Sequence, residues 1–291
     1  EKTSLKGTWK LSGGKYQLTT EIPGDFHNAL EKAEIIPNPF YGFNEQDVLW
    51  VGRTDWIIER SFDYTKVEGT KAILELTEVD TFFTIFINDK EIGKGHNEFA
   101  RHRFDVTSAI KDGENEIKIL IESPENKAIE KMKKLPYPIP CSEYDVFSPG
   151  RNLVRKCQCN AGWDWGPCLM ISGIYGDIVI HTVSDGLFNN LTVTYELIDE
   201  TLKEWVATVT AEYEAYREKE KDFTFVINGE DIDEVTKTVT TNLKIGVNKI
   251  VAKLSVTKPW VWKTSCELRE IGKTENILYN LSVMQKDTAS G

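Results

Sequence analysis

Short runs of alternating apolar and polar residues, separated by Gly, Asn, Asp and Pro, recur along the first two thirds of the chain. These runs predict strands at residues 8–20 (with a turn at Gly13-Gly14), 56–63, 73–79, 81–87, 91–95, 104–106 and 116–121. Ile117, Ile119 and Ile121 share one face of the last strand. Such a series of short strands predicts a β-sandwich or jelly roll.

Two segments carry a helical pattern instead. Asp25, in the turn Pro23-Gly24-Asp25, is placed to cap a short helix running through Asn28 to Ala33. The segment 124–135 predicts a helix with charges around most of its circumference, which favours a solvated face over a binding patch. Residues 174–183 return to the strand pattern and are expected to close a first domain.

The pattern changes after residue 184. Residues 187–283 contain about seven strand-like runs separated by polar turns, which is typical of an immunoglobulin-like sandwich. The sequence therefore predicts an all-β protein with domains at 1–183 and 184–285 and a disordered tail at 286–291.

Composition and charge narrow the range of partners. The 291 residues carry a net charge of −11, and no run approaches the ~18 apolar residues of a membrane helix. An acidic chain without clustered Lys and Arg argues against nucleic acid or an anionic membrane as partner and favours a neutral ligand and a soluble protein. The chain begins at Glu1 without an apolar leader, so secreted, periplasmic and lysosomal locations all stay open.

The cysteines do not form an obvious framework. The odd number argues against a dense set of disulfides; the five are Cys141, Cys157, Cys159, Cys168 and Cys266. The spacing Cys157-Gln158-Cys159 is not that of a zinc site, and no histidine stands beside it. We therefore expect no metal, and buried structural thiols.

The stretch from Ala161 to Pro167 places Asp164 between Trp163 and Trp165. A carboxylate accepts hydrogen bonds from sugar hydroxyls while an indole covers the C–H face of a pyranose, so the trio suits sugar recognition. Equally, the two tryptophans could share the buried face of a strand, with Asp164 bonded to nearby backbone N–H groups. Spacing alone leaves both interpretations open.

The loop from Phe40 to Glu45 is aromatic and polar, with rings at Phe40, Tyr41 and Phe43. Loops of this composition often bind ligands. The alternative is that the three rings close one end of the sandwich core.

Catalytic motifs are missing from the sequence. No convincing pair of carboxylates, Ser-His-Asp set or metal-ligand cluster occurs, and the histidines are scattered singly at positions 27, 96, 102 and 181. The residues alone therefore predict a two-domain β protein with a sugar-compatible site rather than a catalytic one.

Several motifs nevertheless resemble those of one known family. The most specific are Arg155-Lys156-Cys157-Gln158-Cys159 and Gly162-Trp163-Asp164-Trp165-Gly166-Pro167. Others are Pro23-Gly24-Asp25-Phe26-His27, Pro37-Asn38-Pro39-Phe40-Tyr41-Gly42-Phe43-Asn44-Glu45, Val79-Asp80-Thr81 and Pro259-Trp260-Val261-Trp262. On these residues the chain resembles the N-terminal part of glycoside hydrolase family 2, and within it the β-mannosidases.

The resemblance implies a galactose-binding-like jelly roll followed by an immunoglobulin-like sandwich. It implies that the chain is a non-catalytic fragment of a retaining exo-β-mannosidase whose (β/α)₈ barrel, with both catalytic glutamates, is absent here. The partners would be that barrel and a β-mannoside or manno-oligosaccharide, and no cofactor or metal would be required.

The same resemblance implies the site residues. Trp163 would wall the −1 sugar subsite, Asp164 would accept hydrogen bonds from the mannose, and Asn44 and Glu45 would line the same rim. Asn88-Asp89 departs from the family's usual Asn-Gly turn.

Two competing functions stay open. One is a free-standing carbohydrate-binding module, and the other is a pair of sandwiches with a structural or protein-binding role. The aglycone and the oligomeric state also stay open.

Overall fold

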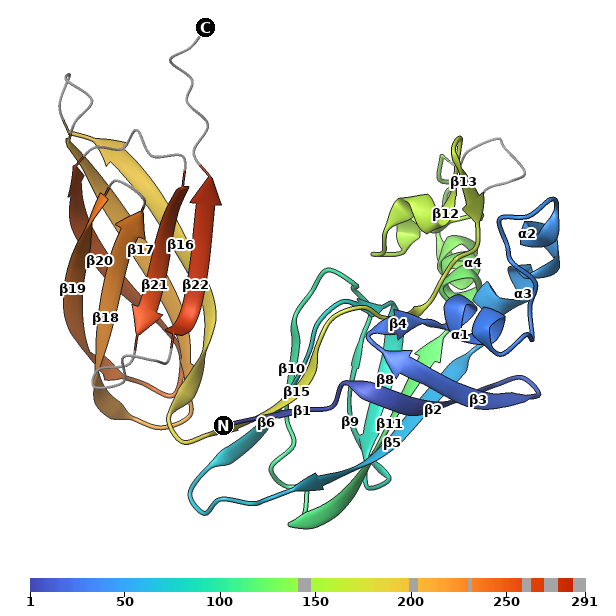
Figure 1. The fold of residues 1–291 in the computed structure, drawn as a ribbon, viewed down its shortest axis with the longest axis horizontal. Helices are drawn as coiled ribbons and strands as arrows, with labels where there is room; N and C mark the ends of the chain where they lie inside the picture. Colours follow the sequence, from blue (N-terminus) through green and yellow to red (C-terminus); the bar gives the residue numbers. More distant parts are fainter. Residues whose placement is uncertain (141–147, 199–203, 230–231, 258–262, 270–276, 285–291) are drawn as a thin grey trace, which may run out of the picture. The chain divides into compact units, whose positions relative to one another are not determined.

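The computed structural model describes residues 1–140, 148–198, 204–229, 232–257, 263–269 and 277–284. The chain divides into two compact units, unit 1 (residues 1–183) and unit 2 (residues 184–291) (Figure 1). Each unit has its own hydrophobic core among the described residues. The predicted disordered tail at 286–291 and the motif Pro259-Trp260-Val261-Trp262 lie outside the described residues.

The two largest antiparallel sheets in the described part of unit 1 pack on a common core. The larger has the order β3-β2-β5-β11-β8-β9, with β2 (Gly7–Gly13), β3 (Tyr16–Ile22), β5 (Trp56–Tyr64), β8 (Phe82–Ile87), β9 (Lys90–Gly95) and β11 (Gly113–Glu122). The smaller has the order β1-β15-β6-β10, with β1 (Lys2–Ser4), β6 (Lys71–Leu76), β10 (His102–Asp105) and β15 (Ile178–Val183). This is the predicted β-sandwich.

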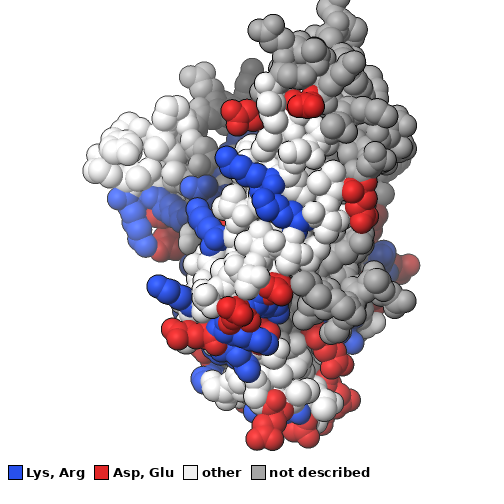
Figure 2. All heavy atoms as spheres, turned by 90° about the vertical axis from the view of Figure 1, so that its left-hand side faces the viewer, with Lys and Arg blue, Asp and Glu red and all other residues white. Residues whose placement is uncertain are grey.

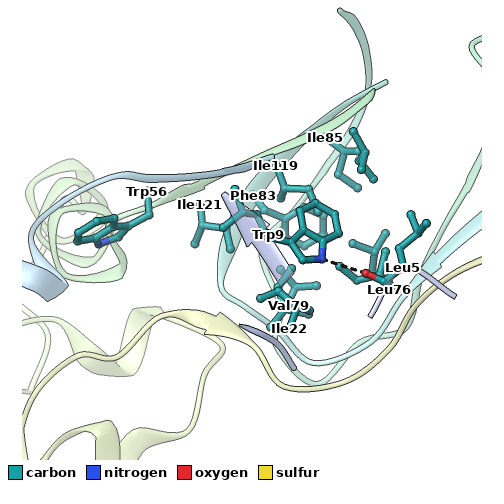
Figure 3. Close-up of a cluster of buried hydrophobic side chains, with 14 of the residues drawn as sticks. Leu5, Trp9, Ile22, Trp56, Leu76, Val79, Phe83, Ile85, Ile119 and Ile121 are labelled. Atoms are coloured by element: carbon teal, nitrogen blue, oxygen red, sulfur yellow. Dashed lines mark hydrogen bonds between the residues drawn. The ribbon is translucent and has the colours of Figure 1, made fainter. Parts of the chain in front are cut away.

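Alternate residues of these strands fill the space between the sheets. Trp9 from β2 and Phe83 from β8 meet Leu76 from the opposite sheet (Figure 3). The Trp9 indole Nε1 donates a hydrogen bond to the Leu5 carbonyl oxygen at 2.9 Å, so its one polar group is satisfied in the interior. The alternation predicted for β11 is confirmed, because the core contains Ile117, Ile119 and Ile121.

The predicted strand at 73–79 is wrong in its second half. Strand β6 ends at Leu76, and Val79 and Asp80 form a separate short strand, β7 (Val79–Asp80). Glu78 between them has φ 53°, and a left-handed residue interrupts the pleat of a strand. The break places Asp80 in a third small sheet, of order β4-β14-β7, with β4 (Gly24–Asp25) and β14 (Gly173–Ile174).

The described residues of unit 1 also form four short α-helices, α1 (Phe26–Lys32), α2 (Asn44–Asp47), α3 (Leu49–Gly52) and α4 (Pro124–Lys134). The predicted cap is confirmed, because an Asp25 side-chain oxygen accepts a hydrogen bond from the Asn28 N–H at 2.9 Å. Helix α1 begins two residues before the predicted start. Helix α4 begins with Pro124, a residue that is common in the first turn of a helix, and the Ser123 hydroxyl caps it by accepting a hydrogen bond from the Asn126 N–H.

Unit 2 is a sandwich of a three-stranded and a four-stranded antiparallel sheet, of orders β16-β17-β20 and β19-β18-β21-β22. Its strands are β16 (Gly186–Leu197), β17 (Glu204–Ala215), β18 (Lys219–Gly229), β19 (Ile232–Leu243), β20 (Gly246–Thr257), β21 (Lys263–Arg269) and β22 (Ile277–Met284). Within the described residues these are the seven strands expected of an immunoglobulin-like sandwich. Edge contacts among Phe188, Tyr213 and Phe223 fill one part of its core.

Charges of both signs lie side by side on the face drawn in Figure 2. In unit 2, for example, the Asp185 carboxylate is within salt-bridge distance of Arg217, Lys219 and Lys221.

In the part of the chain that the structure describes, no helix has the length and apolar character needed to cross a membrane.

Candidate functional site

The stretch with two tryptophans forms a small hairpin that projects from unit 1. Strand β12 (Ala161–Trp163) pairs with β13 (Gly166–Cys168), with Ala161 opposite Cys168 and Trp163 opposite Gly166 (Figure 1). Asp164 and Trp165 form the turn between them. Since the first two residues of β12 are buried and the next three are exposed, the hairpin is anchored at its base and displays its tip.

The tip presents two rings and one carboxylate to solvent. Trp163 is 44% exposed and Trp165 is 73% exposed. Asp164 is also exposed, and it forms no hydrogen bond or ion pair with any residue that the structure describes. The alternative of a buried strand with Asp164 satisfied by backbone groups is therefore wrong. A free carboxylate beside an indole face is able to accept hydroxyl hydrogen bonds.

Arg151 supports the hairpin from the side. Its guanidinium carbon lies 5.7 Å from the centroid of the Trp163 ring, and Nη1 donates a hydrogen bond to the Gly162 carbonyl oxygen at 2.7 Å. A cation over an indole and a charged hydrogen bond to the backbone both restrict how Trp163 is presented. Sequence reasoning missed Arg151, because it lies in a different loop segment, the 3-10 helix Arg151–Leu153.

The base of the hairpin is fixed by backbone contacts. The Asn160 carbonyl oxygen accepts hydrogen bonds from the N–H groups of Leu169 and Met170, at 3.2 and 2.8 Å. Helix α3 packs against the same segment so closely that a Cβ on Gly52 would lie 2.7 Å from the Leu169 carbonyl oxygen. The hairpin therefore starts and ends on a tightly packed part of unit 1.

A buried ionic group lies just before the hairpin in sequence. Lys156 Nζ is 2.8 Å from an Asp80 carboxylate oxygen, and the Tyr175 hydroxyl donates to the same oxygen at 3.1 Å. Burial, followed by the negative charge of Asp80, raises the pKa of the Tyr175 hydroxyl, so Tyr175 stays a donor. These contacts connect the segment before the hairpin to β7 and to the residue after β14.

Two further buried groups adjoin this ion pair. The Glu98 carboxylate accepts a hydrogen bond from the Cys157 N–H at 2.7 Å, and burial together with the charge of Asp80 raises the pKa of Glu98. His27 is buried with both ring nitrogens unpartnered within the described residues. Burial, and to a lesser extent the charge of Lys156, lowers the pKa of His27 to about 4, so the ring is neutral near pH 7.

Asn44 and Glu45 lie on α2 at the same end of unit 1 as the hairpin (Figure 1). Asn44 Nδ2 donates a hydrogen bond to the Asn38 carbonyl oxygen at 2.8 Å. Glu45 is close enough to Cys168 for its charge to add to the effect of burial, which raises the pKa of that thiol. No hydrogen bond or ion pair links Asn44 or Glu45 to Trp163 or Asp164 in the structure.

The aromatic loop that precedes α2 is open to solvent. Phe40, Tyr41 and Phe43 are 77–79% exposed. The alternative that these rings close the sandwich core is therefore wrong, and that role belongs to residues such as Trp9 and Trp56.

The described cysteines differ from the sequence expectation. Cys157, Cys159 and Cys168 are free thiols and partly exposed, so the prediction of buried thiols is wrong for these three. They lie in or beside the hairpin, where the chain makes tight turns near the surface. Among the described residues no three metal-ligating side chains come together.

Comparison with known proteins connects this geometry to a family. Residues 8–176 match the family described as glycosyl hydrolase 2 galactose-binding domain-like. A β-mannosidase of Rattus norvegicus is 31% identical over 74% of this chain, and the match covers 25% of that protein. The chain thus spans about a quarter of the length of this curated relative.

Solved structures agree with this assignment. A β-D-mannosidase from Dictyoglomus thermophilum matches 98% of this chain with a TM-score of 0.86 and 26% identity, over 36% of its own length. An exo-chitosanase from Amycolatopsis orientalis, at 12% identity and a TM-score of 0.61, covers 97% of this chain and 33% of its own, and shares the fold. The resemblance seen in the sequence is confirmed: the chain belongs to the glycosyl hydrolase 2 family and corresponds to the galactose-binding-like N-terminal region of β-mannosidases.

Proposed function

We propose that this chain is the non-catalytic N-terminal part of a retaining exo-β-mannosidase, and that its hairpin tip forms one edge of the −1 sugar subsite. The observation that carries the proposal is the exposed pair of Trp163 and Asp164 at the tip of an anchored hairpin. Family membership and the relatives named β-mannosidase support the choice of sugar.

The chemistry of the tip fits this role. The Asp164 carboxylate offers acceptors for vicinal hydroxyl groups, and the Trp163 indole offers an apolar face for the C–H side of a pyranose. Arg151 restricts the position of the indole through its contact with the ring and its hydrogen bond to the Gly162 carbonyl oxygen. Asn44 and Glu45, on the neighbouring helix α2, would line the outer rim of the same subsite.

The catalytic groups would lie outside these 291 residues. A retaining glycosidase needs two carboxyl groups about 5–5.5 Å apart, one as acid/base and one as nucleophile. In the proposed enzyme a (β/α)₈ barrel supplies both, and the hairpin of this chain completes the sugar pocket from the side.

The decisive experiment is Asp164→Ala in the full-length protein that contains this chain, assayed with an aryl β-mannoside. Loss of a hydrogen bond between a hydroxyl and a charged acceptor, worth about 1.5–3 kcal/mol, predicts a roughly 10- to 150-fold fall in kcat/KM. Asp63→Ala, which removes an exposed carboxylate from β5, is the matched control and should leave kcat/KM unchanged. Equal activity of both variants would rule out the role assigned to Asp164.

Sugar preference is tested separately by comparing aryl β-mannoside, β-galactoside and β-glucuronide as substrates. Preference for the mannoside by the full-length protein, and no hydrolysis by the 291-residue chain, are the expected results. If the full-length protein hydrolyses the galactoside or the glucuronide faster than the mannoside, Trp163 and Asp164 bind a different sugar.

A second candidate is a free-standing carbohydrate-binding module. The exposed rings of Phe40, Tyr41, Phe43 and Trp165 favour it, because solvent-facing aromatic rings are suited to stacking on sugars. Calorimetry of the 291-residue chain with manno-oligosaccharides separates the two candidates. If this chain alone binds the sugar saturably, with a dissociation constant below the millimolar range, the result would favour the carbohydrate-binding module.

A further inference from the structure

Two thiols meet at the base of the hairpin. Cys157 Sγ and Cys159 Sγ are 3.2 Å apart, and both residues are partly exposed. A disulfide bond is about 2.05 Å long, so the two sulfur atoms need to move toward each other by only about 1 Å to form one.

The backbone also allows the bond. Two residues separated by one other span at most about 7 Å even when fully extended, and disulfides join Cα atoms about 4.4–6.8 Å apart. Here the chain turns into the 3-10 helix Gln158–Asn160 directly after Cys157, which shortens the span further.

The residues around the pair are held in place, so the thiols are presented together. The Cys157 N–H donates to the Glu98 carboxylate at 2.7 Å. The Gln158 side-chain amide donates to three carbonyl oxygens, those of Arg151, Val154 and Lys156. Lys156 itself is anchored by its ion pair with Asp80.

A dithiol of this kind suits oxidation better than zinc binding. Structural zinc requires four ligands, and among the described residues no group of three candidate ligands surrounds the pair. A disulfide needs only the two sulfur atoms. The small ring closed by neighbouring cysteines is strained, and strained, exposed disulfides are those that are readily reduced again.

We propose that Cys157 and Cys159 are a redox-sensitive dithiol that forms a reversible intrachain disulfide and thereby alters the hairpin Ala161–Cys168. With a small-molecule disulfide such as oxidised glutathione as the oxidant, one cysteine thiolate attacks a sulfur of the oxidant and expels one glutathione thiolate. The second cysteine thiolate then attacks the mixed disulfide and expels the other glutathione. The two cysteines lose two electrons and two protons, and the oxidant becomes two thiols.

The hairpin responds because it adjoins the pair directly. Asn160 follows Cys159, and its carbonyl oxygen accepts both hydrogen bonds that tie down the return strand, from the Leu169 and Met170 N–H groups. Drawing Cys159 toward Cys157 displaces Asn160 and weakens these bonds. The hydrogen bond between the two thiols, followed by burial, raises the pKa of Cys157, so oxidation should be faster in mildly alkaline buffer.

The test needs no sugar hydrolysis and is therefore independent of the proposed function. The 291-residue chain is equilibrated with mixtures of reduced and oxidised glutathione, free thiols are alkylated, and the peptides are analysed by mass spectrometry. The expected product is a peptide that contains Cys157 and Cys159, carries no alkyl group on either and is lighter by two hydrogen atoms. Alkylation of both thiols at every ratio, or a bond from either to a third cysteine, would overturn the proposal.

Variants and hydrogen exchange complete the test. Cys159→Ser should leave Cys157 as a mixed disulfide with glutathione, whereas Cys168→Ser, the matched control, should still form the bond. In the oxidised chain the amides of residues 161–168 should exchange roughly tenfold faster than in the reduced chain, and this change should be absent in Cys159→Ser. Unchanged exchange in the oxidised chain would contradict the coupling to the hairpin.

Discussion

Lys156 Nζ lies 2.8 Å from Asp80 Oδ2 inside unit 1, with the two side chains 1% and 0% exposed. The pair joins the segment before the hairpin to the small sheet β4-β14-β7. Two charges removed from water are tolerated because each neutralises the other and because Tyr175 adds a hydrogen bond to the carboxylate.

Removal of the lysine is expected to be costly. Lys156→Met leaves the Asp80 carboxylate buried without its counter-ion and should lower the free energy of unfolding of unit 1 by about 3–5 kcal/mol. Lys71 and Asp105 form a pair at the same 2.8 Å but with side chains 43% and 47% exposed, so Lys71→Met should cost only about 0–1 kcal/mol. Urea unfolding of both variants measures the difference, and equal losses would contradict the importance of burial.

His27 should make unit 1 less stable in weak acid. Its pKa is about 4 in the folded chain against an ordinary 6.5, because burial disfavours the charged ring. Above pH 6.5 both states are neutral and His27 has no effect. Between pH 6.5 and about 4 the unfolded chain binds a proton that the folded chain does not, so stability falls by up to about 3 kcal/mol and then levels off.

The variant His27→Leu isolates this effect. Between pH 6.5 and about 4, its unfolding free energy should depend less on pH than that of the wild type. Above pH 6.5 the two proteins should show the same pH dependence. His96→Leu, which replaces an exposed histidine, is the control. Parallel curves for the wild type and His27→Leu would show that His27 is not the group that titrates.

Arg151 should stabilise the hairpin locally rather than the whole unit. Arg151→Ala removes a charged hydrogen bond to the Gly162 carbonyl and the contact with the Trp163 ring, together worth about 2 kcal/mol. The amides of residues 161–166 should then exchange roughly 30-fold faster, while those of β5 and β11 are unaffected. Arg217→Ala, in unit 2, is the control and should leave these exchange rates unchanged. Unchanged exchange rates in Arg151→Ala would show that the guanidinium does not support the hairpin.

Gly13 allows Trp56 to pack closely. A Cβ at Gly13 would overlap the Trp56 indole, which is fully buried and held by a hydrogen bond from Nε1 to the Val51 carbonyl oxygen at 3.0 Å. Gly13→Ala should therefore destabilise unit 1 by about 1–3 kcal/mol. At Gly166 a Cβ meets no atom within 4 Å, so Gly166→Ala should be nearly neutral. Thermal melts compare the two, and an unchanged Tm for Gly13→Ala would mean that the indole moves aside.

Features that depend on neighbouring residues were predictable from the sequence. The inward alternation of Ile117, Ile119 and Ile121, the Asp25 cap and the turn between β2 and β3 each follow from the period of a strand or from a hydrogen bond only a few positions long. The break in β6 was missed because nothing in the residue type of Glu78 demands a left-handed backbone.

By itself the sequence determined two β-sandwiches, an acidic chain and a motif of two tryptophans flanking an aspartate that suits a sugar. Only the tertiary structure decided whether those rings are buried or displayed, and which charges lie beside them. Asp80 and Tyr175, for example, are 95 positions apart, and only the pairing of β7 with β14 brings them within hydrogen-bonding distance. Burial and the pairing of distant side chains depend on how whole sheets pack, and no local periodicity encodes that.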